Sequence, residues 1–148
     1  MSGERSTASS ASDPPGSLLL AFDRFDDTFS QGLASETAAL FAEGGRVMWP
    51  AMEDIVGRTA IESALAEFFA GFTLLAPFSP ERQVIEVGTD RAFTLGRFTE
   101  DLRPKSEGPA YRVHGRIVEL WSRVDDGDWE LDVLLTSRYA ENETLPRT

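Results

Sequence analysis

The sequence predicts an α+β domain in which helices come first and antiparallel strands follow. Up to Gly71, apolar residues recur with helical spacing, whereas beyond it they alternate with polar residues in segments separated by turn residues. The clearest signal is a long strand pattern over residues 111–124, then a tight turn at 125–128 and a second strand over 129–137. With 148 residues and 41% hydrophobic content, the chain has the size of one domain.

Two helices are expected before the first strand. The first covers residues 17–30, where Leu18 and Phe22 belong to one apolar face. A shorter helix fits residues 35–41, and Gly44 follows as a helix breaker.

The third helix carries the clearest start signal. Thr59 is expected to cap it, with Glu62 three residues later completing a capping box. After this helix ends near Gly71, strands are expected. They cover residues 83–87, 91–102, 111–124 and 129–137, and one short strand over residues 46–49 is expected before the third helix.

Composition excludes several classes of function. A net charge of −11 would repel a phosphate backbone, so nucleic-acid binding is not expected. The absence of cysteine excludes disulfides and thiol nucleophiles, and with a single histidine no metal site is predicted. The acidic turn at residues 125–128 lacks the later glutamate of a calcium loop.

The two ends of the chain differ from its centre. Residues 1–16 are rich in Ser, Ala, Gly and Pro, which predicts a disordered leader. The domain is expected over residues 17–139, with a flexible tail over 140–148. The first apolar run is too short for a signal peptide or a membrane span, so a soluble cytoplasmic protein without a membrane partner is expected.

Three motifs in a fixed order suggest a family. They are Gly57-Arg58-Thr59-Ala60-Ile61, Leu120-Trp121-Ser122-Arg123 before an Asp-Asp-Gly turn, and Trp129-Glu130-Leu131 after that turn. Together they resemble the nuclear transport factor 2-like superfamily, in particular its SnoaL-like and ketosteroid-isomerase-like members. The resemblance covers residues 17–139.

This resemblance implies a cone-shaped domain. A curved mixed or antiparallel sheet would wrap around about three N-terminal helices and enclose an apolar pocket. It also implies a homodimer, a small apolar or aromatic organic ligand, and no cofactor. Because the superfamily contains both enzymes and binding modules, the function has to be argued from the pocket residues.

The resemblance also implies specific pocket positions. Glu119 falls where ketosteroid isomerases carry a neutral carboxylic acid that donates to the substrate oxyanion, a form that an apolar pocket favours. The isomerase base falls at Trp49, and the oxyanion tyrosine falls at about Phe25. An intact ketosteroid isomerase site is therefore absent.

The phase of strand 91–102 is expected to turn Arg97 and Asp101 toward Glu119. Asp101 would then act as the base, Glu119 as the acid or oxyanion donor, and Arg97 as the orienting cation, much as epoxide hydrolases of this superfamily use an arginine with paired carboxylates. The alternative is a structural ion pair between Arg97 and Glu119, with Asp101 at an exposed rim.

His114 is a further catalytic candidate, because histidine titrates near neutral pH and dehydratases of this superfamily use strand histidines. Strand alternation from Glu119 instead places His114 on the outer face, as a surface or interface residue, unless a bulge at Gly115 reverses the phase.

Seven side chains are expected to contact the ligand: Phe25, Trp49, Met52, Phe68, Trp121, Asp132 and Thr136. For Trp49 the alternative is packing in the core. The sequence thus predicts a small cofactor-independent SnoaL-like enzyme of isomerase, cyclase, dehydratase or epoxide hydrolase type. A non-catalytic ligand-binding or dimerisation module of the same fold is the alternative.

Overall fold

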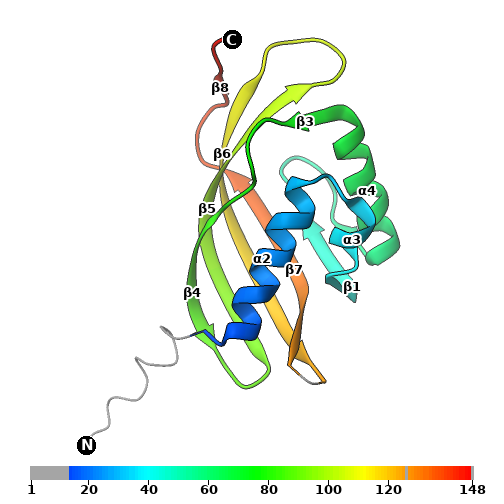
Figure 1. Cartoon of the computed structure of the whole chain (residues 1–148), viewed down its shortest axis with the longest axis vertical. Helices are drawn as coiled ribbons and strands as arrows, with labels where there is room; N and C mark the ends of the chain where they lie inside the picture. Colours follow the sequence, from blue (N-terminus) through cyan, green and yellow to red (C-terminus); the bar gives the residue numbers. More distant parts are fainter. Residues whose placement is uncertain (1–13, 126, 148) are drawn as a thin grey trace, which may run out of the picture.

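The computed structural model of the protein describes residues 14–125 and 127–147. Of the leader expected over residues 1–16, residues 1–13 lie outside the described residues. Within the described ranges, a strongly curved eight-stranded sheet forms one layer, and three helices lie against its concave side (Figure 1). The predicted α+β class and the curved sheet around three helices are confirmed.

The helices are α2 (Gly16–Ser30), α3 (Ala34–Ala38) and α4 (Arg58–Gly71). The first lies across the concave face of the sheet (Figure 1) and buries a stripe consisting of Leu18, Ala21, Phe22, Phe25 and Phe29. This periodic stripe is the physical reason for the helix, because each turn adds apolar area to the core. No helix in the described part of the chain has the length and hydropathy needed to cross a membrane.

The strands are β1 (Phe41–Met48), β2 (Ile55–Val56), β3 (Phe72–Leu74), β4 (Glu81–Val87), β5 (Arg91–Pro104), β6 (Tyr111–Val124), β7 (Asp128–Arg138) and β8 (Glu143–Thr144). Their order is β2-β1-β7-β6-β5-β3, with β4 pairing to β5 and β8 to β6. Only the β1–β7 pair is parallel among these described pairings, so the sheet is mixed. Part of the segment predicted as a tail thus forms β8.

The capping box predicted for the third helix is wrong. The helix begins at Arg58, its N-cap is Gly57 with φ of 96°, and no side chain caps it. Tertiary contacts fix this end instead, because the Gly57 N–H donates to the Gly45 carbonyl at 2.8 Å and Arg58 Nε donates to the Phe41 carbonyl at 2.7 Å.

The predicted boundary between the second helix and the first strand is also wrong. The helix ends at Ala38, and β1 begins at Phe41 and runs through Gly44, which was expected to break the helix, and through Gly45. The register of β1 against β7 shifts between Phe41 and Arg46. A Cβ on Gly45 would lie 2.9 Å from the Ala42 carbonyl oxygen, so this glycine allows the close approach at a bulge.

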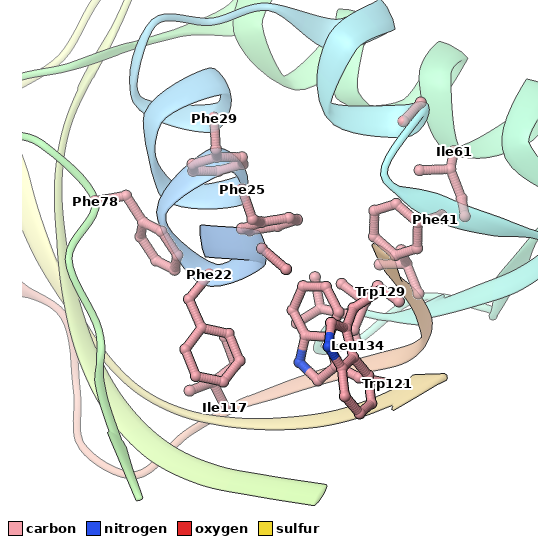
Figure 2. Packing of buried hydrophobic residues seen from close by; sticks show 14 of the residues in the cluster. Phe22, Phe25, Phe29, Phe41, Ile61, Phe78, Ile117, Trp121, Trp129 and Leu134 are labelled. Carbon is pink, nitrogen blue, oxygen red and sulfur yellow. The ribbon is translucent and has the colours of Figure 1, made fainter. Parts of the chain in front are cut away.

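The core lies between α2 and the inner face of the sheet. Figure 2 shows Phe22, Phe25 and Phe29 projecting from α2, with Phe78 beside them. The rings of Phe22 and Trp121 meet edge to face with centroids 5.6 Å apart. Fully burying each such ring contributes roughly 2–3 kcal/mol, so this layer holds the helix on the sheet.

Candidate active site

A cavity of about 320 Å³ opens between the C-terminal half of α2, α4, the loop after β1, and the inner faces of β5, β6 and β7. Its size is within the range of small-molecule sites, roughly 300–1,000 Å³. Seven aromatic side chains line it: Phe25, Phe29, Trp49, Phe68, Phe78, Phe98 and Tyr111. The cavity is therefore suited to a flat apolar molecule.

The aromatic rings form a continuous wall. The Phe29 and Phe78 centroids lie 5.0 Å apart, and those of Phe78 and Phe98 lie 5.4 Å apart. On the other side, Phe68 links Phe29 to Trp49, with centroid distances of 5.9 and 6.1 Å. Such edge and offset contacts fix ring positions, so this wall is preorganised.

Glu100 brings a carboxyl group into this apolar surrounding. It lies on β5 between Phe98 and Leu102, and all three line the cavity. Among the described residues, no hydrogen bond or ion pair is formed by its carboxyl group. Burial raises the pKa of Glu100 to about 7, because the charged form loses its hydration. Near neutral pH the group is therefore able both to accept and to donate a proton.

Two further polar groups lie at the same end of the sheet. Tyr111 on β6 is paired with Leu102, and Arg138 at the end of β7 is paired with Gly115. Burial and then the charge of Glu100 raise the pKa of Tyr111, whereas Arg138 acts in the opposite direction. The phenol therefore stays protonated and can donate a hydrogen bond into the cavity.

Glu119 faces inward, as strand alternation predicts, but it does not line this cavity. Its carboxylate accepts from Arg82 Nε at 2.8 Å, from the Thr94 hydroxyl at 2.8 Å and from Trp121 Nε1 at 3.2 Å. Arg82 also donates to both oxygens of Asp26, at 2.8 and 2.9 Å. Glu119 thus belongs to a buried ion-pair network, in which Arg82 takes the place proposed for Arg97.

The predicted phase of β5 is wrong, and with it the convergence of Arg97 and Asp101 on the cavity. The Arg97 guanidinium lies 5.3 Å from the Tyr139 ring on the outer face. Asp101 accepts from Arg112 Nε at 2.7 Å across the β5–β6 pair. This ion pair lowers the pKa of Asp101.

Small residues on the inner face of β5 explain the error. Ala92 and Thr94 are buried there, whereas Leu95 on the other face is 38% exposed. A Cβ on Gly96 would lie 2.5 Å from the Glu81 carbonyl oxygen and 3.0 Å from the Ile117 side chain. Close packing selects small side chains in the first half of this inner face, where the larger Leu95 lies outside, although Phe98 and Leu102 follow on the inner face.

His114 lies on the outer face, where alternation from Glu119 places it. Its Nε2 is 3.1 Å from Glu143 Oε1, and its ring lies beside Tyr139. It does not line the cavity.

The structure divides the residues that were predicted to bind the ligand. Phe25, Trp49, Met52, Phe68 and Thr136 line the cavity. Trp121 and Asp132 do not line it, so the prediction that these two side chains contact the ligand there is wrong.

Trp121 is buried beneath Phe22, and Asp132 accepts a hydrogen bond from Ser122. A register shift between Leu120 and Trp121 changes the phase of β7 near Asp132, and this shift was not considered in the sequence-based assignment.

Sequence reasoning missed Glu100, Tyr111, Arg138 and Asn142. The signal for Glu100 was present, because Phe98 and Leu102 flank it at i−2 and i+2 and therefore share its face. The other three lie near strand ends, where alternation alone does not show which residues reach a cavity.

A curved mixed sheet that wraps around helices and leaves an aromatic cavity defines a fold class that solved structures share. A ketosteroid isomerase-like protein from Erwinia carotovora atroseptica has this fold, with a TM-score of 0.74 and 17% identity over 83% of this chain and 94% of that chain. A putative scytalone dehydratase from Novosphingobium aromaticivorans is similar too, with a TM-score of 0.67 and 20% identity over 88% and 90%.

ActVI-ORFA from Streptomyces coelicolor aligns with a TM-score of 0.67 and 12% identity, over 82% of this chain and 94% of that chain. No protein-family model matches the sequence, and no curated protein sequence matches it. The chain therefore has the nuclear transport factor 2-like fold that its motifs predicted, shared with ketosteroid-isomerase-like and dehydratase-like structures.

Proposed function

We propose that the protein is an enzyme that transfers protons to or from a small, largely aromatic organic molecule, with Glu100 as the acid–base group. The observation that carries this proposal is a carboxyl that forms no ion pair with any described residue, lies in an aromatic cavity, and has its pKa raised to about 7. A catalytic group is most effective when its pKa lies near the working pH. Proton transfer by a carboxyl requires no cofactor.

The roles follow from the chemistry of the lining. Ionised Glu100 would remove a proton from a carbon next to a carbonyl, and the protonated acid would return it at a second position. Tyr111 would donate a hydrogen bond to the oxyanion that develops between these steps. Isomerisation, cyclisation, dehydration and epoxide opening all use such a pair, and the isomerase-like and dehydratase-like similar structures support this range.

Exchange of substrate protons with deuterated water tests the proposal without knowledge of the natural substrate. Wild type should accelerate deuterium incorporation into 1-tetralone or 1-indanone, measured by mass spectrometry against a protein-free blank. Glu100→Gln should lower the protein-catalysed rate by about 100-fold or more, because loss of a general base typically costs 10²–10⁴. Glu86→Gln, which removes an exposed carboxylate of β4, is the matched control. An unchanged rate in Glu100→Gln would exclude Glu100 from the chemistry.

A ligand-binding module is the second candidate. Phe25 and Trp49 occupy the positions of the isomerase tyrosine and base in the resemblance. Both line the cavity, and neither side chain is an acid or a base. If 1-tetralone binds to wild type but its exchange stays at the blank rate, the binding module is the better description.

We also propose that the protein forms a homodimer through the outer face of the sheet. Leu95 and Leu120 on this face are 38% and 40% exposed, and clustered apolar residues on a sheet face favour association. Analytical ultracentrifugation should give the mass of two chains for wild type and of one chain for the Leu95→Glu, Leu120→Glu double variant. A wild type with the mass of one chain would refute the dimer.

A further inference from the structure

Arg138 is the cationic group of the cavity lining. Within residues 14–125 and 127–147, Glu100 and Arg138 are the charged residues that line the cavity, and they come from the strands on either side of β6. They do not form an ion pair with each other. Arg138 is an exposed residue at the end of β7, so the two charges line one cavity without neutralising each other by contact.

The environment of Arg138 differs from that of the arginines that hold structural ion pairs. Arg82 and Arg112 each bind a carboxylate through two nitrogens. Arg138 forms no ion pair within the described part of the chain, and its described side-chain hydrogen bond is a long one, 3.5 Å from Nη1 to Asn142 Oδ1. Most of its five N–H donors are therefore available to a ligand.

The position of Arg138 sets the orientation of a bound molecule. Leu134, Thr136 and Arg138 follow one another at intervals of two on β7, and all three line the cavity. A ligand that inserts its ring between the aromatic walls would therefore present its other end to Arg138. A planar guanidinium binds a carboxylate with two parallel hydrogen bonds, which few neutral groups can match.

The charge balance at this end favours an anion. The titratable and charged groups that line the cavity are Glu100 on β5, Tyr111 on β6 and Arg138 on β7. Below about pH 7 Glu100 is protonated, so these groups together carry one positive charge. Above that pH the Glu100 carboxylate offsets Arg138, and an anionic ligand loses part of its attraction.

We propose that Arg138, oriented by Asn142, forms an anion subsite in the cavity and selects aromatic molecules that carry a carboxylate. The inference rests on the proposed function only because it places the ligand in the same cavity. The bound carboxylate would in turn favour the protonated form of Glu100 and so keep it available as an acid.

Calorimetric titration with 2-naphthoate and its neutral analogue 2-naphthamide tests the subsite. At about pH 6 wild type should bind the carboxylate about tenfold more tightly than the amide, the size expected for a charge-assisted hydrogen bond. Arg138→Gln should reduce this ratio to about one, and Arg138→Lys should retain part of it. Arg103→Gln, which removes the same charge from the outer face of β5, should keep the ratio of wild type.

Glu100→Gln separates this inference from the proposed function. It should keep the preference for naphthoate and make the ratio equal at about pH 6 and about pH 8, because the group that titrates is gone. Equal affinity of wild type for the two compounds, no affinity for either, or a preference that survives in Arg138→Gln would each overturn the subsite. Proton exchange in 1-tetralone, which has no carboxylate, tests the role of Glu100 on its own.

Discussion

The charged form of Glu100 is stabilised neither by a hydrogen bond nor by an ion pair from the described residues. Its neighbours in the cavity wall are Phe98, Leu102 and Val113, and no described donor reaches its carboxyl group. Glu119, only two strand positions from the cavity residue Ile117, has four hydrogen bonds from three side chains. Two inward carboxyl groups on one sheet thus lie in opposite environments, since Glu119 is paired with Arg82 and Glu100 forms no ion pair with a described residue.

Glu100 should make folding stability depend on pH. Its pKa is about 7 in the folded protein and near the ordinary 4.5 in the unfolded chain, so the folded state holds the proton more tightly. The resulting stability is fully present below about pH 4.5 and is lost as the pH rises to about 7. Between about pH 4 and about pH 8, wild type should therefore lose roughly 3 kcal/mol of unfolding free energy relative to Glu100→Gln.

Urea unfolding of wild type, Glu100→Gln and Glu86→Gln at the two pH values measures this effect. Glu86→Gln should follow wild type at both. The same pH dependence in wild type and Glu100→Gln would show that Glu100 titrates normally.

Sequence reasoning could place Glu119 inward but could not identify its partner. Alternation along β6 correctly placed Glu119 inside and His114 outside, because side chains of a strand alternate between faces. Its partner Arg82 belongs to β4, whose pairing is set by β5 and not by any local pattern. The distinction between a structural and a chemical carboxyl depends on such long-range contacts.

At the scale of elements, the buried clamp between α2, β4 and β6 holds the helix to the sheet. Arg82 links Asp26 of α2 to Glu119 of β6, and its side chain is 7% exposed. Replacing Arg82 with Met would leave Glu119 buried and without its counter-charge. The expected loss is about 3–5 kcal/mol of unfolding free energy.

Denaturant unfolding of Arg82→Met against Arg91→Met, an exposed arginine of β5, checks this loss. The Arg82→Met, Glu119→Gln double variant should recover part of it, since the unpaired charge is then removed. A loss below about 1 kcal/mol, the size typical of exposed pairs, would mean that the clamp is solvated.

Gly115 on β6 leaves the space that the ring of the cavity residue Phe98 on β5 occupies. A Cβ on Gly115 would lie 2.3 Å from Cζ of Phe98, the residue paired with it across the strands. Gly115→Ala should displace this ring, destabilise the fold by about 1–3 kcal/mol and change the affinity of cavity ligands. Gly44→Ala, where a Cβ meets nothing within 4 Å, should leave ligand affinity unchanged.

Thermal unfolding and titration with 1-tetralone provide the two measurements. Wild-type stability and affinity in Gly115→Ala would contradict the contact between Gly115 and Phe98.

The elements themselves were predictable to different degrees. The β6–β7 hairpin was predicted closely, because alternation and an acidic turn with glycine act locally. The predicted strand was shorter than β1, because Gly44 and Gly45 were interpreted as helix breakers. Only the pairing with β7 shows that they belong to a bulged strand. The phase of β5 was missed because the first half of its inner face consists of the small residues Ala92, Thr94 and Gly96.

For the whole molecule, the order of motifs was sufficient to predict the fold. The helices and the curved mixed sheet follow one arrangement that many sequences can encode (Figure 1). An apolar cavity lies between these layers. The chemistry of the cavity was not predictable in the same way. It depends on which strand ends the curvature brings together, and Glu100, Tyr111 and Arg138 meet only in the folded sheet.

The most direct test of this account is the titration of the Glu100 carboxyl carbon by ¹³C NMR, with Glu100→Gln used for assignment. We predict a pKa of about 7 in the ligand-free protein, which would show a proton-transfer group poised at neutral pH. A pKa near the ordinary glutamate value of 4.5 would show a solvated carboxylate and would contradict the central role given to Glu100.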